Sequence, residues 1–372
     1  MPSPPPTALT PAGPPNGLHR DDRDDRDDRN DRDDRKRLLL LRLSAIGDIV
    51  HTLPVAAVLA AARYEVIWAV QPGGRPLVAG NPAVPSCVVI PASTPFRPGA
   101  LSRAVAALRA ARPEIALDLQ GLWKSGFWAR ASGATRRVGW SGAARREPLS
   151  SLLLTERHDL PAGIVHVIDK NLALLGALGL HAVGRRDFPL PPFEREAAQV
   201  DRELAALGLE RPVLFHPGGG WSSKLWPAEH YGELASRLAR RRIPTLVSWG
   251  PGEEDLAQRV VAASGGTAIA CFPCNLLELA ALAGRARAIV AADTGPLHLA
   301  CAVGTPAVAL FGPTDPARNG PWNPADRVLS RRPPCFPCHR RECPTHRGIL
   351  AEIPVAEVEQ ALLTRIGLAD AR

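Results

Sequence analysis

The sequence predicts an α/β protein with two doubly wound domains, each built on a parallel sheet. Short apolar runs typical of buried strands alternate with helical segments along most of the chain. One alternation begins at residues 38–43, and a second begins at 212–215, after a proline-rich stretch at 188–195. The chain has 372 residues, which is enough for two domains of ordinary size.

The order of the elements follows from these runs. In the first half we expect strands at 38–43, 65–70, 87–90 and 115–118, a loop entering a helix at 44–54, a helix at 101–111 and a loop at 119–125. In the second half we expect strands at 212–215, 244–249, 267–270, 286–291 and 307–311, and helices at 194–207, 254–263, 276–283 and 355–366. The predicted boundaries are a tail at 1–37, an acceptor-binding Rossmann-like domain at 38–187, a nucleotide-sugar-binding Rossmann-like domain at 188–347 and a C-terminal helix at 348–372.

Composition limits the classes of protein. Residues 21–35 repeat Asp-Asp-Arg without apolar residues, so we expect the tail to be disordered. The formal net charge is +8, which is compatible with nucleic acid, an anionic membrane surface or a phosphorylated substrate. No secretory signal and no apolar run of membrane-spanning length is present, so we expect a cytoplasmic protein whose seven cysteines are reduced.

The segment 292–300 predicts a site for a nucleotide sugar. Asp293 and Thr294 follow the apolar run 286–291, and Gly295 opens the next helix. The amide groups at a helix start suit a phosphate group, and ligands of open α/β sheets bind at the carboxyl ends of the strands. Asp293 can accept hydrogen bonds from sugar hydroxyls, and His298 follows about one turn into the helix.

A glycine-rich loop after the first strand of the second half predicts contact with phosphate. Gly218, Gly219 and Gly220 allow close approach of the backbone, and Ser222 and Lys224 follow them. The Lys224 ammonium can neutralise a diphosphate leaving group. Neither a Walker loop nor a dinucleotide fingerprint is present, and the alternative is a glycine-rich turn with a solvated lysine.

Three further acids are candidates. Asp48 follows the first strand and could take a proton from an acceptor hydroxyl, or it could cap the next helix. Glu253 and Glu254 follow a strand and could hold ribose hydroxyls, or they could be first-turn acids favoured by the helix dipole.

Basic residues gather in the first half, where arginine forks suit phosphate and carboxylate groups. The candidates for binding an acidic acceptor are Lys124, Arg130 and Arg146. Their basic neighbours include Arg136, Arg137 and Arg145. A solvated basic face is the alternative. No nucleic-acid-binding motif is present, so we expect no nucleic-acid partner.

Cysteines near the C-terminus leave two interpretations open. Cys335, Cys338 and Cys343, with His339 and His346, could hold a structural metal. The alternative, which we favour, is a loop with reduced thiols and no metal site.

Several motifs in order resemble glycosyltransferase family 9, the lipopolysaccharide heptosyltransferases, over nearly all of the chain after residue 37. They are Ser44–Pro54, Asp118–Ser125, Arg146–Leu149, Lys224–Pro227, Trp249-Gly250, Asp293–His298 and Gly312–Pro316. The resemblance implies a GT-B fold, in which two Rossmann-like domains face a central cleft. It also implies inversion at the anomeric carbon and no obligate metal or other cofactor.

The resemblance further implies substrates and roles. The donor would be ADP-L-glycero-β-D-manno-heptose, and the acceptor would be Kdo of lipid A, in inner-core biosynthesis. The enzyme would make peripheral contact with the inner membrane at its cytoplasmic face, where this acceptor is presented. Asp48 would be the general base and Lys224 would stabilise the departing diphosphate. Glu254 would bind ribose and Asp293 the heptose hydroxyls. Thr294, Gly295 and His298 would line the pocket, with backbone amides of the glycine loop beside them.

Two other functions stay open. One is a family 9 transferase with another nucleotide sugar or a later core acceptor, because specificity for one hydroxyl depends on pocket shape. The other is a non-catalytic protein that binds sugar nucleotides. The presence of Asp48, Lys224 and Asp293 together disfavours the non-catalytic alternative.

Overall fold

The computed structural model describes residues 35–92, 98–338, 341–342 and 348–368. Residues 1–34 of the predicted tail and Cys343 lie outside these ranges, whereas Arg37, which the sequence analysis counted with the tail, is the first residue of a strand. The first sheet has the order β3-β2-β1-β4-β5-β6 and is parallel throughout. Its strands are β1 (Arg37–Leu41), β2 (Glu65–Val70), β3 (Ser86–Val89), β4 (Ile115–Asp118), β5 (Arg136–Trp140) and β6 (Glu156–His158).

The second sheet repeats this topology with the order β12-β11-β10-β7-β8-β9, again all parallel. Its strands are β7 (Val213–His216), β8 (Thr245–Val247), β9 (Ala268–Ala270), β10 (Ala288–Ala292), β11 (Ala307–Phe311) and β12 (Arg327–Ser330). When each sheet is numbered from its own first strand, both have the order 3-2-1-4-5-6 of the Rossmann fold. The predicted α/β class with parallel sheets is therefore confirmed.

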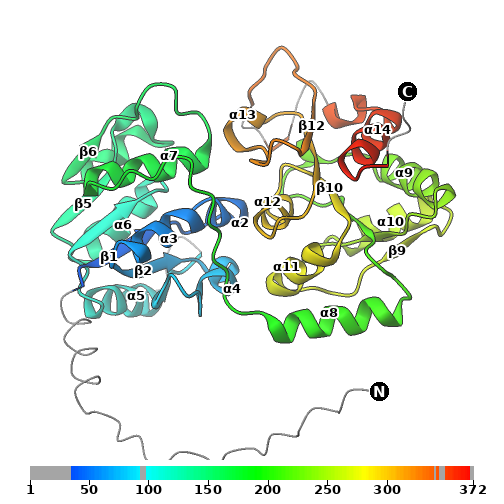
Figure 1. Ribbon diagram of the computed structural model, residues 1–372. Helices are drawn as coiled ribbons and strands as arrows, with labels where there is room; N and C mark the ends of the chain where they lie inside the picture. The colour runs from blue at the N-terminus through cyan, green and yellow to red at the C-terminus, as the bar shows by residue number, and fades with distance from the viewer. Residues whose placement is uncertain (1–34, 93–97, 339–340, 343–347, 369–372) are drawn as a thin grey trace, which may run out of the picture. The chain divides into compact units, whose positions relative to one another are not determined.

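Helices connect the strands of both sheets (Figure 1). In the first half they are α2 (Ile46–Val50), α3 (Leu53–Ala61), α4 (Arg75–Val78), α5 (Pro98–Ala110), α6 (Trp123–Ala131) and α7 (Val167–Ala173). In the second half they are α8 (Glu194–Ala206), α9 (Ala228–Arg240), α10 (Glu254–Ala263), α11 (Leu276–Arg285), α12 (Gly295–Ala302), α13 (Pro316–Asn319) and α14 (Val355–Arg365). Short 3-10 turns include η3 (Pro148–Leu153) and η5 (Ser222–Lys224).

Both sheets are buried on both faces, as continuous apolar strands require. Alternate residues of β1 enter different cores: Leu38 and Leu40 join one cluster, whereas Leu39 and Leu41 join another with residues of α5 and α6. In the second sheet, Val213 and Phe215 of β7 pack with α9, α10 and α14, whereas Leu214 faces the opposite side. This two-sided burial fixes the strand ends from which the site loops leave.

Some elements differ from the sequence-based expectation. The segment 119–125 was expected to be a loop, but α6 begins within it at Trp123. Strands β5, β6 and β12 were not expected. Within the described ranges, no helix combines the length and the hydropathy that a membrane span requires.

Candidate functional site

The candidate site residues lie at the points where strand order reverses. In each sheet the connections leave in opposite directions from two neighbouring strands, β1 and β4 in the first and β7 and β10 in the second. Ligands of open α/β sheets bind outside the carboxyl ends of the strands at such switch points. Asp48 and Asp118 lie at the first switch point, and the glycine loop and Asp293 lie at the second.

Asp293 is the most strongly bonded group at the second switch point. It is 4% exposed and follows β10 directly. Its Oδ2 accepts hydrogen bonds from Lys224 Nζ at 2.5 Å and Thr314 Oγ1 at 2.6 Å. Its Oδ1 is bonded to His298 Nε2 at 3.1 Å and accepts from Asn319 Nδ2 at 2.5 Å. Burial alone would raise the pKa of this carboxyl, but the His298 hydrogen bond and the Lys224 charge outweigh burial and hold the pKa well below its usual range.

Lys224 therefore lies where the sequence predicts a cation. Its Nζ also donates to the Asp293 carbonyl at 3.0 Å and lies 4.6 Å from the centroid of the Trp221 ring. Ser222 is nearby in sequence, but its hydroxyl donates to the Arg341 carbonyl. The ammonium is thus fixed by a buried carboxylate and an aromatic face, which is more order than a solvated lysine would have.

The glycine loop closes around a glutamate. The Glu253 carboxylate accepts hydrogen bonds from the Gly219 and Gly250 amides, each at 2.9 Å. A Cβ atom on Gly218 would lie 2.0 Å from Glu253 Oε2, so only glycine fits there while the carboxylate holds this position. A Cβ atom on Gly219 would lie 3.0 Å from the Thr294 methyl group, which brings the loop next to the start of α12.

The structure distinguishes Glu253 from Glu254. Glu253 precedes the first residue of α10 and faces the loop, with Oε2 3.7 Å from His216 Nε2. Glu254, the ribose ligand that the resemblance implied, is exposed in the first turn. Glu253 is the N-cap residue and Glu254 is the first residue of the helix, so their side chains leave the backbone in different directions. Geometry places Glu253 in this cluster and Glu254 outside it.

His216 ends β7 beneath the glycine loop. Its Nδ1 lies 3.0 Å from Ser248 Oγ, and the ring is 3% exposed. Burial lowers the pKa of His216 to about 4, although Glu253 partly opposes the shift. The ring is therefore neutral near pH 7, and the sequence analysis did not single it out.

Asp48 lies at the start of α2, at the first switch point. Its Oδ2 accepts a hydrogen bond from the Ala45 amide at 3.4 Å, so Asp48 caps the helix. Capping was the alternative to the general-base role in the sequence analysis. The preceding loop is held by Gln120, whose Oε1 accepts from Leu43 N at 2.6 Å and whose Nε2 donates to Ser44 O at 3.0 Å. Capping orients the carboxylate and leaves it half-buried, so the general-base role stays a prediction.

Contacts between α2 and α12 bring the two switch points together. A Cβ atom on Gly47 would lie 2.5 Å from His298 Cδ2, and one on Gly295 would lie 2.9 Å from Ile46 Cβ. Next to this crossing, the ring centroids of His51 and His298 are 4.2 Å apart. His51 is buried, and neither of its ring nitrogens has a hydrogen-bond partner in the described structure. Burial, and then the neighbouring His298 and His166, lower the pKa of His51 well below its usual value.

Four cations lie close to one another beside the first switch point, and one of them, Arg42, is near Asp48. They are Arg42, Arg145, Lys170 and Arg318, and the sequence analysis had named only Arg145 among them. Burial lowers the pKa of Lys170, and the charges of Arg318, Arg42 and Arg145 lower it further, so these groups are close enough to repel one another. Arg145 pairs with the buried Asp118 at 2.5 Å, whereas Arg42 donates to the neutral Asn171 side chain at 3.1 Å. Arg42 Nε has no acceptor within the described residues.

The predicted acceptor residues are more dispersed. Lys124 donates to the Ala92 carbonyl at 3.0 Å, while Arg130 and Arg146 are exposed. Of their basic neighbours, Arg136 pairs with Glu156 across β5 and β6, and Arg137 donates to backbone carbonyls. Arg136 and Arg137 thus stabilise the sheet, whereas Arg130 on α6 and Arg146 before η3 are exposed.

The cysteines do not form a metal centre in the part of the chain that the structure describes, since no group of three or more metal-binding side chains gathers there. Cys343, His339 and His346 lie outside that part. A second Cys-x2-Cys pair, Cys271 and Cys274, has its sulfur atoms 3.9 Å apart. It follows β9, whereas Cys335 follows β12 at the opposite edge of the sheet, so the two pairs cannot share one ion.

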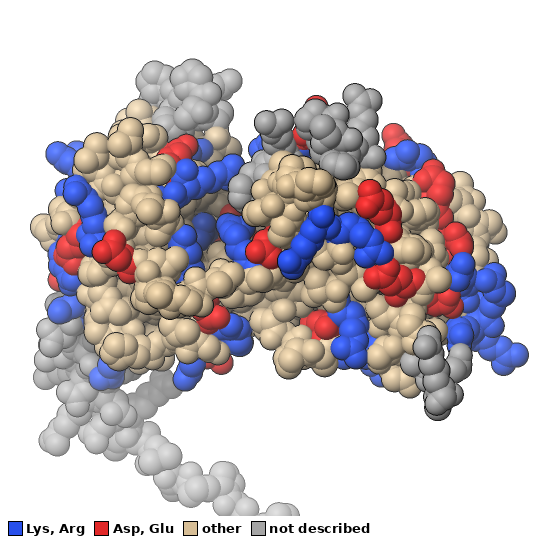
Figure 2. All heavy atoms as spheres, turned by 90° about the horizontal axis from the view of Figure 1, so that it is seen from above, with Lys and Arg blue, Asp and Glu red and all other residues tan. Residues whose placement is uncertain are grey.

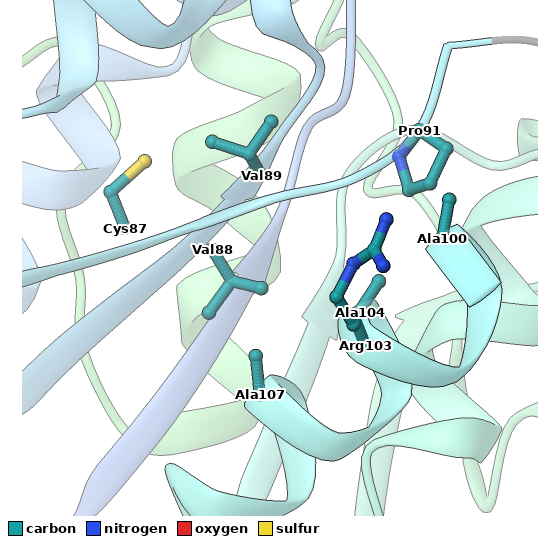
Figure 3. A pocket seen from close by; sticks show the side chains of 8 residues that line it. All are labelled: Cys87, Val88, Val89, Pro91, Ala100, Arg103, Ala104 and Ala107. Atoms are coloured by element: carbon teal, nitrogen blue, oxygen red, sulfur yellow. The ribbon is translucent and has the colours of Figure 1, made fainter.

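A hollow of about 460 Å³ lies between β3 and α5, away from both switch points. Figure 3 shows its lining, which is mostly small or branched apolar side chains with Arg103 as the charged member. It contains none of the convergent polar groups that orient a nucleotide sugar. The switch-point residues are therefore the better candidate site.

The fold and site define a class: two Rossmann-ordered units with a half-buried acid at one switch point and a glycine loop, a lysine and a buried aspartate at the other. Residues 101–348 match the family model of glycosyltransferase family 9 (heptosyltransferase). Lipopolysaccharide heptosyltransferase 1 of Pseudomonas aeruginosa is 31% identical over 82% of this chain and 87% of its own length. The chain belongs to glycosyltransferase family 9, and it is an enzyme of glycosyl transfer.

Solved structures agree on the architecture. A family 9 glycosyltransferase from Veillonella parvula superposes with a TM-score of 0.75 at 22% identity, covering 89% of this chain and 97% of that one. The Escherichia coli heptosyltransferase WaaC with ADP gives a TM-score of 0.71 at 24% identity, covering 88% and 99%. These likenesses establish the GT-B fold for this chain and confirm that prediction.

Proposed function

We propose that this protein transfers heptose from ADP-L-glycero-β-D-manno-heptose to Kdo of lipid A, with inversion at the anomeric carbon. The observation that carries the proposal is the contact of α2 with α12, which brings the acid of one switch point to the loop cluster of the other. The relatives support the choice of substrates: one solved structure is named as WaaC with ADP-2-deoxy-2-fluoro heptose, with a TM-score of 0.67.

The proposed chemistry follows from the positions of the charges. Asp48 takes the proton of an acceptor hydroxyl as that oxygen bonds to the anomeric carbon. The bond from the anomeric carbon to the diphosphate oxygen breaks, and its electron pair stays on the diphosphate. Lys224 and the amides at the start of α12 stabilise this charge. No metal or other cofactor is required in this scheme.

The nucleotide would lie over the glycine loop. Of the two neighbouring acids, we assign Glu253 to the ribose hydroxyls, because its carboxylate lies in the loop and Glu254 is exposed. The Asp293 oxygens are already bonded to Lys224, Thr314 and His298. Asp293 would therefore hold these three side chains in place around the sugar.

The four cations beside the first switch point support an acidic acceptor. Among the described residues, Arg145 pairs with the buried Asp118, whereas Arg42, Lys170 and Arg318 have no carboxylate within ion-pair distance. Figure 2 shows Lys and Arg side chains gathered in the middle of the face that it views. A carboxylate or phosphate of the acceptor would offset their mutual repulsion. We place the reaction at the cytoplasmic face of the inner membrane, where such an acceptor is exposed.

The test is a transfer assay with purified protein, ADP-heptose and Kdo2-lipid A, with ADP release measured in the presence of EDTA. We expect heptosylated product at a rate that EDTA leaves unchanged. Product formation that stops with EDTA would contradict the metal-free scheme. Binding of ADP-heptose without product would contradict the acceptor assignment and favour a later core acceptor, whereas absence of donor binding would contradict the donor.

A further inference from the structure

An apolar and basic surface on the first half does not take part in the proposed chemistry. Its apolar members are Trp123 and Phe127 on α6 and Leu149 and Leu152 on η3, which are 46%, 41%, 66% and 64% exposed. Together with Val89, Val165, Val183, Leu207, Val328 and Leu368, these are the large hydrophobic side chains that the described structure exposes. Four of the ten thus belong to one pair of neighbouring elements.

The two elements form one continuous surface. The Trp123 amide donates to Glu147 Oε2 at 2.6 Å, which ties the start of α6 to the residue before η3. A Cβ atom on Gly126 would lie 2.8 Å from Leu153 Cδ1, so α6 packs directly on η3. The inward sides of both elements are buried, and the outward sides carry the exposed residues.

The spacing of these residues gives each element an apolar outer side. Trp123 and Phe127 are four residues apart on α6, and Arg130 follows three residues later, so all three share one face of the helix. Leu149 and Leu152 are three residues apart in a 3-10 turn, where such residues lie above one another.

Arginines border the apolar residues. Arg130 lies on the same face of α6, Arg146 is exposed just before η3, and Arg157 Nε donates to the Ser151 carbonyl of η3 at 3.0 Å. The acids near them are already engaged: Glu147 accepts the Trp123 amide, Glu156 pairs with Arg136, and Asp159 accepts from Ser141. Aromatic and leucine side chains bordered by arginines, with a net positive charge, are the combination by which proteins bind the interface of an anionic bilayer.

The surface is also directly connected to the catalytic end of the first sheet. The loop before α6 carries Gln120, which holds the backbone of Leu43 and Ser44 in front of α2. A bilayer against α6 and η3 would therefore lie near the loop that positions Asp48.

We infer that α6 and η3 form the membrane-docking surface of this protein, with Trp123, Phe127, Leu149 and Leu152 entering the interface and Arg130, Arg146 and Arg157 contacting anionic phospholipid headgroups. The inference deepens the proposed function, because an acceptor anchored in the same bilayer would reach the first switch point without leaving the membrane.

The test is co-sedimentation of the full-length protein with vesicles of phosphatidylcholine alone or with added phosphatidylglycerol. We expect binding to the anionic vesicles that weakens as NaCl is raised. The variant Trp123→Ser/Leu149→Ser/Leu152→Ser should bind about tenfold more weakly or worse. Arg157→Gln should bind about fivefold more weakly. Leu207→Ser/Val328→Ser and Arg259→Gln, which change exposed residues of other elements, should bind like the unmodified protein.

Several outcomes would overturn the inference. The unmodified protein could ignore both kinds of vesicle, or the triple variant could bind as well as its control. Sedimentation velocity could instead show a dimer that the triple variant dissociates, which would assign the surface to a second copy of the chain. Transfer to a water-soluble Kdo acceptor is measured in parallel: vesicle binding without any transfer would reject the proposed function alone, and normal transfer without vesicle binding would reject this inference alone.

Discussion

Replacing Gly218 with alanine tests the contact that organises the nucleotide loop. The new methyl group would lie 2.0 Å from Glu253 Oε2 and 2.4 Å from its Cδ, so the carboxylate must leave its place. It would then lose its hydrogen bonds from the Gly219 and Gly250 amides, each 2.9 Å long. Hydrogen bonds to a charged group contribute about 1.5–3 kcal/mol each, so two contribute at least about 3 kcal/mol.

Solvent reduces this loss. The Glu253 side chain is 25% exposed, so water can replace part of what it loses. We therefore expect Gly218→Ala to lower the free energy of unfolding by about 2 kcal/mol. Gly220→Ala is the matched control, because a Cβ atom there has no heavy atom within 4 Å, and it should change stability by less than about 0.5 kcal/mol. Neither glycine has a positive φ, so backbone strain contributes to neither effect.

Urea unfolding of a double-mutant cycle measures the prediction. In a Glu253→Ala background the obstructed carboxylate is gone, so Gly218→Ala should cost less than about 0.5 kcal/mol. Calorimetry with ADP provides a second readout, in which Gly218→Ala should raise Kd about tenfold if Glu253 holds the ribose. Equal effects of Gly218→Ala and Gly220→Ala, or an undiminished effect in the Glu253→Ala background, would refute the reasoning.

Three further predictions concern single groups. Asp48→Asn should lower turnover about 10²–10⁴-fold while ADP affinity stays within twofold, and steady-state kinetics with normal turnover would exclude Asp48 as the base. Lys224→Met should lower turnover about 10²–10³-fold, and an unchanged rate would leave Lys224 only the role of balancing Asp293. The folded-state pKa of His216 is lowered from 6.5 to about 4. The neutral ring therefore contributes to the free energy of unfolding above pH 6.5, and this contribution is lost as the pH falls from 6.5 towards 4. When the pH is lowered from 7.5 to 5.5, protonation of this histidine in the unfolded state should reduce the free energy of unfolding by about 1.3 kcal/mol. Denaturant titrations of His216→Gln should not show this reduction. Equal reductions in both proteins would contradict a lowered pKa for His216.

Much of the fold could be predicted because the central strands are buried on both faces. Such strands are continuous apolar runs, and those expected at 65–70 and 115–118 coincide with β2 and β4. The missed strands β5, β6 and β12 lie towards or at the sheet edges, where polar residues are tolerated. In β5, for example, Arg136 was grouped with the candidate acceptor-binding residues, but it pairs with Glu156 of the neighbouring strand β6.

The candidate site was predictable in position but only partly in detail. The sequence locates Lys224 and Asp293 at strand ends, but it does not reveal that they form a buried ion pair. It offers two adjacent acids after β8 without indicating which of them faces the loop, since the difference arises from where α10 begins. Arg42 was missed because it lies in an apolar run, and its neighbours Lys170 and Arg318 come from distant elements.

The repeated Rossmann topology explains why one short helix contact can join the two parts of the site. Each sheet places its ligand-facing loops at the reversal of strand order, so an enzyme with two substrates needs only to bring these two reversals together. The helices that follow β1 and β10 achieve this through Gly47 and Gly295, because a side chain on either glycine would force α2 and α12 apart. The same approach buries His51 against His298, whose Nε2 is bonded to Asp293. Within the described structure, Asp48 is therefore positioned relative to Lys224 by packing and not by a direct bond, which is compatible with the base role that we propose for its carboxylate.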